Sequence, residues 1–237
     1  MGARHAAVGP TDHLAVGLDQ AGPGAGTASV GQVRAATRGC RSLADGAATG
    51  HNAGMALLRY TVITSLDGYV NDAEGGFSWA EPSDELHEVV NTHEREVGTY
   101  LLGRRLYETM RYWETAPGDV PGPMGEYARI WRAADKVVYS TTLEDVTTAR
   151  TRLAASFDPA EVAALKASSV LDVSVGGPTL AVEAFRAGLV DDVHQFLHPV
   201  LVGGGTRALP DGVHDRLDLV SADRVGDVVH LHHRVRH

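Results

Sequence analysis

Residues 175–180 (VGGPTL) form the pattern in this chain that is best suited to holding a phosphate group. They follow a β-branched run and open an amphipathic segment. Gly176 and Gly177 lack a Cβ, so the backbone there can approach a ligand closely. Pro178 suits the first helical position, with Thr179 beside it, and the helix would point its free N–H groups at the anion. A tight turn without a ligand is the alternative that these residues leave open.

Two further segments offer groups that bind phosphate. Arg104 and Arg105 follow Gly103 at a turn, and paired guanidinium groups can grip a phosphate through charge-assisted hydrogen bonds. Ser140 and Thr141 follow another expected strand and offer hydroxyl donors to the same phosphate. Ligands bind outside the carboxyl ends of strands in open α/β sheets, which is where all five residues are expected. A solvated helix start is the alternative for the two arginines.

Acidic and aromatic residues near the end of the first expected strand suggest a second binding surface. Asp67 follows the strand predicted over 58–65. A carboxylate there can bind an amino-substituted heterocycle or orient a water, or it can simply cap the turn before the next glycine. Phe77 and Trp79 either wall a pocket for a flat ring or fill the loop.

The histidines are weighed as metal ligands and are not expected to form a metal site. His194 and His198 would share one face of a strand but lie far apart along it. His230 and His232 fall on the outward phase of the last expected strand. Metal ligands have to converge on one point, so these side chains are interpreted as structural or solvated.

Composition divides the chain into two parts. Residues 1–54 contain 11 Gly and 13 Ala but no aromatic residue, and are expected to form a disordered extension. Residues 55–237 read as a globular domain, with Met55 as a plausible true start. The net charge of −9 argues against nucleic-acid binding. The lone Cys40 excludes an internal disulfide, which fits a cytoplasmic protein, and no apolar run approaches membrane-spanning length.

The spacing of apolar residues predicts alternating strands and helices. Strands are expected over 58–65, 99–102, 136–140, 170–175, 193–202, 217–222 and 228–235, and helices after Ser83, Gly103, Asp158 and Gly177 and over 127–134. This order predicts an α/β fold with a mixed, mostly parallel sheet flanked by helices and a C-terminal antiparallel hairpin.

In order and spacing, the segments SLDGYV (65–70), LGRRLYE (102–108), VYSTTL (138–143) and VGGP (175–178) resemble the dihydrofolate-reductase-like superfamily, RibD C-terminal type. The resemblance covers about residues 57–236. It implies a three-layer fold, NADPH as cofactor and a homodimer built through 193–202 and the last hairpin. It also implies that the phosphate-binding segments above hold the cofactor and that Asp67, Tyr69 and Trp79 face the substrate, with Asp67 as the catalytic acid.

Two departures from the riboflavin-pathway reductases bear on the substrate. Those proteins usually carry Lys where this chain has Tyr69 and Glu where it has Val175, and no deaminase zinc signature is present. The resemblance therefore implies an NADPH-dependent reductase of a small pterin- or aminopyrimidine-like heterocycle. The alternatives are a 5-amino-6-(5-phosphoribosylamino)uracil reductase and a non-catalytic nucleotide- or pterin-binding protein on the same scaffold.

Overall fold

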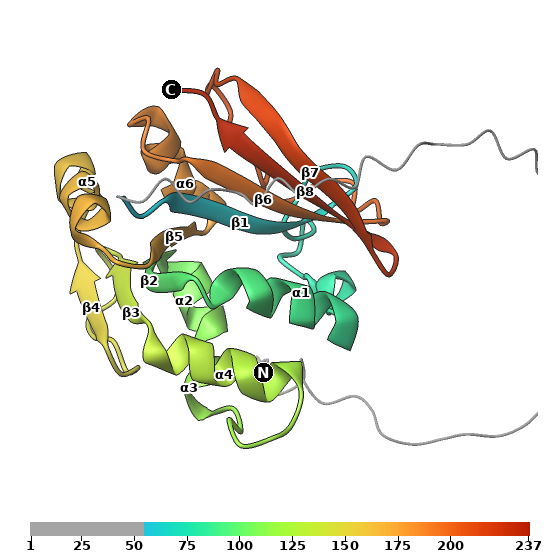
Figure 1. Cartoon of the computed structure of the whole chain (residues 1–237), viewed down its shortest axis with the longest axis horizontal. Coiled ribbons are helices and arrows are strands. Elements are labelled where there is room, and N and C mark those ends of the chain that lie inside the picture. Colours follow the sequence, from blue (N-terminus) through green and yellow to red (C-terminus); the bar gives the residue numbers. More distant parts are fainter. Residues whose placement is uncertain (1–54) are drawn as a thin grey trace, which may run out of the picture. The chain divides into compact units, whose positions relative to one another are not determined.

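A computed structural model describes residues 55–237, so the extension expected over 1–54 lies outside the described residues (Figure 1). One eight-stranded sheet forms the centre, in the order β4-β3-β2-β5-β1-β6-β8-β7. Its strands are β1 (Leu58–Ser65), β2 (Val97–Gly103), β3 (Asp135–Tyr139), β4 (Thr151–Ala154), β5 (Asp172–Gly176), β6 (Asp192–His198), β7 (Leu217–Val225) and β8 (Val228–Val235).

The helices start at capping residues that the sequence marks. They are α1 (Asp84–Glu94), α2 (Arg104–Met110), α3 (Tyr112–Thr115), α4 (Pro123–Ala133), α5 (Pro159–Ser168) and α6 (Pro178–Arg186), with a 3₁₀ turn η1 (Ser78–Ala80). The Ser83 hydroxyl accepts the Leu86 N–H at 3.2 Å, and the Asp158 carboxylate accepts the Ala160 N–H at 2.8 Å. Both predicted helix starts are confirmed, because each cap satisfies an otherwise unpaired N–H group.

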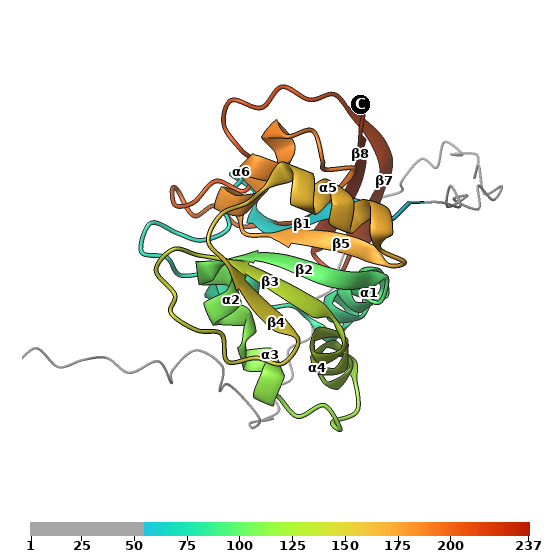
Figure 2. The same cartoon turned by 90° about the vertical axis from the view of Figure 1, so that its left-hand side faces the viewer.

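The sheet is parallel from β4 to β6 and antiparallel only at its C-terminal end. β5 enters late in the chain and lies between β1 and β2, so the direction of winding reverses there. The predicted mostly parallel α/β sheet with a closing hairpin is confirmed. Figure 2 shows the arrowheads of β2 and β5 pointing to the same edge, where α2 and α6 begin.

Helices cover both faces of the sheet. α5 and α6 lie on one face, over a core that includes Leu58, Tyr60 and Val175. α1 and α4 lie on the other, where Trp131, Val138 and Phe196 are buried. Alternate residues of each strand supply the two cores. No helix in the described part of the chain is long and apolar enough to cross a membrane.

The strand predicted over 193–202 is shorter than expected. β6 ends at His198 because Pro199 follows, and proline has no N–H to continue the ladder. β4 and α3 were not predicted, since each has only four residues and none of them is fully buried.

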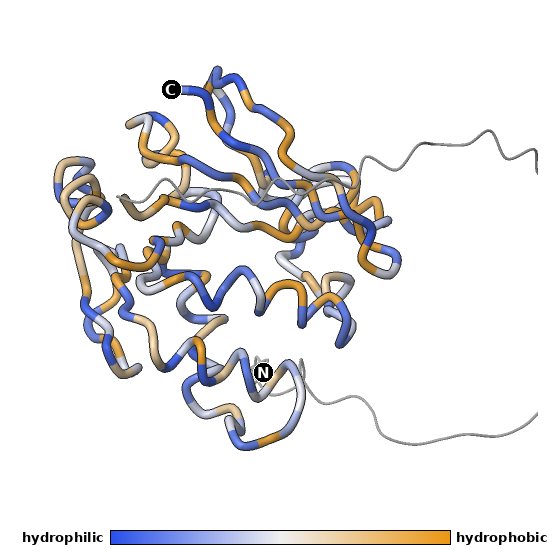
Figure 3. Tube along the Cα trace, in the orientation of Figure 1, coloured by the Kyte–Doolittle hydropathy of each residue, from blue (hydrophilic) through white to orange (hydrophobic). Residues whose placement is uncertain are grey.

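The outward phase predicted for His230 and His232 is wrong: the His232 ring stacks on buried His194, and His230 is itself buried. Only 3% of the surface of His230 is exposed, because β8 lies between two strands and α1 covers that face of the sheet. Figure 3 shows hydrophobic and hydrophilic residues mixed along the β7–β8 hairpin, which makes the buried phase hard to recognise from sequence.

Candidate functional site

The predicted phosphate- and substrate-binding residues come together at the carboxyl edge of the parallel strands. Arg104 follows β2, Ser140 follows β3, Gly177 follows β5 and Asp67 lies two residues beyond β1. These four strands are direct neighbours in the order β3-β2-β5-β1. The edge therefore spans the reversal of winding between β2 and β1, which is where ligands bind in open α/β sheets.

Asp67 joins the end of β1 to the loop after β6. Its carboxylate accepts the backbone N–H groups of Val202 and Gly203, at 3.2 and 2.7 Å. A side-chain hydrogen bond from Ser65, together with these backbone bonds, holds the pKa of Asp67 below its ordinary value, so the group is ionised at neutral pH. Asp67 therefore caps the loop after β6 rather than the turn before Gly68, and each carboxylate oxygen keeps a second lone pair for a ligand.

Tyr69 and Trp79, both expected to face the substrate, lie in the segment between β1 and α1. The Tyr69 N–H donates to the Ser65 hydroxyl at 3.0 Å. The guanidinium of Arg207, from the loop after β6, lies 5.6 Å from the centre of the Tyr69 ring. Trp79 lies on η1, and its indole N–H is buried without a hydrogen-bond partner among residues 55–237.

His198, the last residue of β6, is a potential site residue that sequence reasoning interpreted as structural or solvated. Its ring lies 5.8 Å from that of Trp79, edge to face. The side chain is 6% exposed, and its Nε2 has no hydrogen-bond partner within the described residues. Burial lowers the pKa of His198, so the imidazole is neutral at pH 7. The sequence could not indicate this role, because His198 and Trp79 are brought together only by the folding of β6 and η1.

Arg104 is held toward the end of β3. Its Nε donates to Glu108 Oε1 at 2.8 Å, and its Nη1 donates to the Thr142 hydroxyl at 2.7 Å. The Ser140 hydroxyl already accepts the N–H groups of Thr142 and Leu143, at 3.1 and 3.0 Å. Thr142 is therefore the hydroxyl presented beside the guanidinium, a role that sequence reasoning gave to Ser140 and Thr141.

Arg105 and Thr141 are both exposed at this edge. Among these groups the structure joins Arg104 to Thr142, and the phosphate site as a whole stays a prediction.

Gly176 and Gly177 allow β5, β2 and α2 to pack closely. A Cβ on Gly176 would lie 2.5 Å from Leu106 Cδ2. Gly177 has φ of +91°, a conformation that side chains disfavour, and a Cβ there would lie 3.8 Å from Gly103 N. Leu106 therefore fills the space beside Gly176, and the two glycines let the end of β5 pass close to the start of α2.

The start of α6 completes this glycine cradle. Pro178 occupies the first turn, no side chain caps the helix, and Thr179 follows. Pro178 has no N–H, and the Leu180 and Ala181 N–H groups donate to the Gly177 carbonyl oxygen at 3.1 and 3.0 Å. The Thr179 N–H and the positive end of the helix dipole are therefore what this helix start offers an anion. Glycine cradle, helix start and Arg104 together form a surface complementary to a phosphate-bearing ligand.

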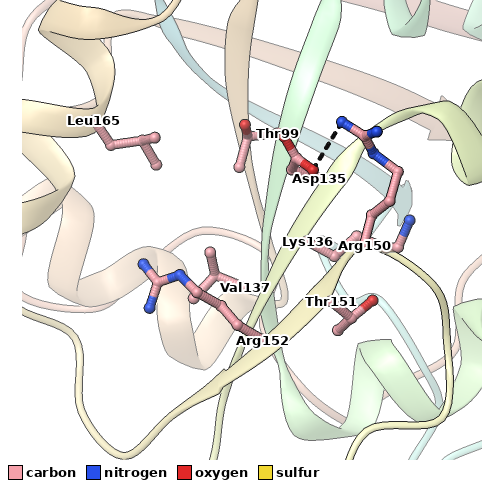
Figure 4. Close-up of a pocket in the computed structure, with 8 residues that line it drawn as sticks. All are labelled: Thr99, Asp135, Lys136, Val137, Arg150, Thr151, Arg152 and Leu165. Atoms are coloured by element: carbon pink, nitrogen blue, oxygen red, sulfur yellow. Dashed lines mark ion pairs between the residues drawn. The ribbon is translucent and has the colours of Figure 1, made fainter.

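A cavity of about 460 Å³ lies away from this edge (Figure 4). Its walls include the first residues of β3 and β4, and an ion pair between Arg150 and Asp135, 2.9 Å long, crosses its rim. The cavity therefore lies at the amino ends of these strands and contains none of the predicted site residues.

Comparisons with known proteins agree with this architecture. A family model described as the RibD C-terminal domain matches residues 56–231. A solved structure of a protein from Shewanella sp. PV-4, provisionally described as a riboflavin biosynthesis protein, is similar with a TM-score of 0.60. The two are 17% identical, over 76% of this chain and 99% of that chain. No curated protein matches the sequence significantly.

Two other solved structures share the fold. A pyrimidine reductase-like protein from Corynebacterium diphtheriae has a TM-score of 0.56 and 15% identity, over 77% of this chain and 92% of that one. A diaminohydroxyphosphoribosylaminopyrimidine deaminase/5-amino-6-(5-phosphoribosylamino)uracil reductase from Thermotoga maritima has a TM-score of 0.55 and 16% identity. That match covers 77% of this chain but only 57% of the Thermotoga chain.

The family match spans every strand of the sheet except the end of β8, and the solved structures share its fold. The mostly parallel sheet with flanking helices and a C-terminal antiparallel hairpin is the fold that the sequence resemblance implied. The chain belongs to the RibD C-terminal domain family.

Proposed function

We propose that the protein is an NADPH-dependent reductase that transfers hydride to a small pterin- or aminopyrimidine-like heterocycle. One observation carries the proposal. In this member of the family, the residues expected to bind phosphate and the acidic and aromatic residues expected to bind the substrate lie at the same edge of the sheet. Gly177 after β5 and Asp67 after β1 belong to neighbouring strands, so two ligands bound there would lie side by side.

The cofactor half suits NADPH. Gly177, with its positive φ, turns the chain directly into α6, and the positive end of this helix favours a pyrophosphate beside the Thr179 N–H. Arg104, already bonded to Thr142, supplies positive charge and donors for the 2′-phosphate that distinguishes NADPH from NADH. When bound, NADPH supplies the hydride, while the protein supplies orientation and electrostatic complementarity.

The substrate half suits a flat ring that carries amino groups. Ionised Asp67 accepts hydrogen bonds from such groups and does not donate a proton at neutral pH. Reduction of a C=N or C=O bond places the hydride on carbon and requires one proton on nitrogen or oxygen. Solvent supplies that proton, and His198 beside Trp79 is placed to relay it through its two ring nitrogens.

Titration with NADPH and NADH, followed by nicotinamide fluorescence, tests the cofactor half. We expect Arg104→Ala combined with Arg105→Ala to weaken NADPH binding about 10- to 150-fold, because a hydrogen bond to a charged group contributes about 1.5–3 kcal/mol. NADH binding should change much less, since NADH lacks the 2′-phosphate.

Arg186→Ala is the matched control for this titration. Arg186 also forms an exposed ion pair within one helix, with Glu183 at 3.4 Å, but it lies at the far end of α6. NADPH affinity should be unchanged in this variant. Absence of binding by either nucleotide in the wild-type protein would refute the reductase and favour a nucleotide- or pterin-binding protein without catalysis.

Arg207 favours one more specific function, reduction of a phosphoribosylaminopyrimidine in riboflavin biosynthesis. The Thermotoga protein of this fold is described as such a reductase. This chain has Tyr69 at the position where the resemblance implies a lysine. The Arg207 guanidinium lies over the Tyr69 ring, so a positive charge is present at that position from another residue. Complementation of a riboflavin auxotroph tests this alternative, and Arg207→Ala should abolish the complementation if Arg207 binds the substrate phosphate.

A further inference from the structure

Four histidines converge under the C-terminal end of α1, away from the carboxyl edge. His93 comes from α1, His194 from β6, and His230 and His232 from β8. His194 and His232 lie directly opposite each other in the antiparallel pair. His194 lies four residues before His198, the last residue of β6, so about 13 Å of strand separates it from the carboxyl edge. The cluster is therefore separate from the proposed reductase site and does not rest on that function.

The imidazole nitrogens lie at distances suited to a shared metal ion. His194 Nδ1 and His230 Nε2 share a hydrogen bond at 3.1 Å, which a metal ion would replace, and one nitrogen from each of His93, His194 and His230 lies within 4.8 Å of the other two. Zinc binds histidine nitrogen at about 2.0–2.1 Å, so tetrahedral ligand nitrogens lie about 3.4 Å from each other. Small rotations of these rings would thus place three nitrogens around one ion.

The most buried ring of the cluster has an unsatisfied nitrogen. His194 is 2% exposed, and its Nε2 has no hydrogen-bond partner within residues 55–237. A buried polar atom left unpaired is unfavourable and points to an absent partner. His93 is only partly buried and provides a path for an ion to enter from the surface.

A carboxylate stands behind the cluster. Asp192 Oδ2 lies 3.1 Å from His232 Nε2, and Asp192 Oδ1 accepts from Arg234 at 3.2 Å. Metal-binding histidines are commonly oriented by a carboxylate in this way. The same Asp192, with His194 and His232, also forms a second group of potential ligand atoms within 4.8 Å of one another.

The nearby cation does not prevent binding of a dication. Arg59, which donates to the His93 carbonyl oxygen at 3.3 Å, is buried but is paired with both Glu96 and Asp172.

We propose that His93, His194 and His230 bind one divalent first-row transition-metal ion of the Zn²⁺ class, with His232 and Asp192 alongside. Imidazole nitrogens suit Zn²⁺, Co²⁺, Ni²⁺ or Cu²⁺, whereas Mg²⁺ and Ca²⁺ require oxygen ligands. The ligands come from α1, β6 and β8, so the ion clamps the helix onto the sheet. Its role is structural, because the site lies far from the carboxyl edge.

Metal binding by the full-length chain is the direct test. The protein is stripped with a chelator and dialysed against ZnCl₂, CoCl₂ or MgCl₂, and bound metal is measured by elemental analysis. We expect one zinc per chain, no magnesium, a higher melting temperature with zinc, and the intense visible absorption of four-coordinate Co²⁺. Weak, non-stoichiometric binding or the pale spectrum of octahedral Co²⁺ would overturn the proposal.

Variants separate this site from the other histidines of the chain. His93→Gln should lower zinc affinity by more than 100-fold, since losing an outer partner alone costs roughly 10- to 100-fold. Its fold and its melting temperature without metal should stay near wild type, because His93 is partly exposed. His233→Gln is the matched control, next to His232 on β8 but facing the opposite side, and should bind zinc normally. Wild-type affinity in His93→Gln would refute the assignment.

Discussion

At the residue scale, the chemistry of each polar group depends on which hydrogen bonds it already forms within the protein. Asp67 was identified from its place after a strand, but its bonds to Val202 and Gly203 join residues 135 and 136 positions apart. Such a pairing has no local sequence pattern. The role of Thr142 could not be predicted for the same reason, because the residue that it contacts, Arg104, lies 38 positions away in the sequence. Residue types at the edge were thus predictable, whereas their partners were not.

Asp67→Asn should raise KM for an amino-substituted heterocycle about tenfold or more, because the charged acceptor is lost. Steady-state kinetics measure this change. Asp72→Asn is the control, since Asp72 lies on the same segment but accepts only from its own turn, at Gly76 N. Equal effects of the two substitutions would contradict a substrate role for Asp67.

The pH dependence of Asp67 has a defined sign. The pKa of the folded protein lies below the ordinary value of 3.8, so the carboxylate and the stability that it contributes persist above that pH and are lost as pH falls through the lowered value. The profile of kcat/KM against pH should therefore show no acid limb from Asp67 above pH 3.8. A limb above that value that vanishes in Asp67→Asn would refute this assignment.

At the element scale, capping residues and glycines decide where strands and helices stop. Ser83 and Asp158 could be recognised as helix caps because the pattern is local. The edge strand β4 could not be recognised, because its four residues are all at least partly exposed and its pairing with β3 depends on distant sequence. Local rules therefore located most elements, while short edge elements depend on tertiary contact.

Neighbouring glycines in the loop after β6 offer a matched pair of substitutions. Gly205 has φ of +128°, and a Cβ there would lie 2.0 Å from the Asn71 carbonyl oxygen. Gly205→Ala should lower the free energy of unfolding by at least about 1–3 kcal/mol through backbone strain. Gly204→Ala has open space and should stay within about 0.5 kcal/mol of wild type in urea unfolding. Similar losses in both variants would contradict this account.

At the scale of the whole molecule, the outer hairpin offers apolar side chains to solvent. Leu217, Leu219 and Val220 of β7 are 41%, 60% and 41% exposed. Exposed apolar groups of this kind mark interaction surfaces, and β7 is also an open edge of the sheet. We propose that two chains pair through this hairpin as a homodimer, as the resemblance implied.

Sedimentation equilibrium tests this pairing. The wild-type protein should sediment as twice the chain mass of 25.1 kDa, and Leu219→Glu should shift it to one chain, because a charge would be buried in the interface. Val170→Glu, at a 97% exposed apolar residue before β5, should leave the dimer intact. A wild-type mass equal to one chain would exclude the homodimer.

The late insertion of β5 also determines when the chain can fold during synthesis. β1 is made first among the strands, yet its neighbours are β5 and β6. The Leu57 and Leu58 N–H groups bond to Asp172 and Asp191, which lie 115 and 133 residues downstream. A ribosome must therefore release most of the domain before its central strand finds a partner, and such long-range pairing is slow. Until then the nascent chain exposes β1 as an apolar strand without neighbours. Among the strands, β1 would therefore be accessible for the longest time to chaperones that bind extended apolar segments.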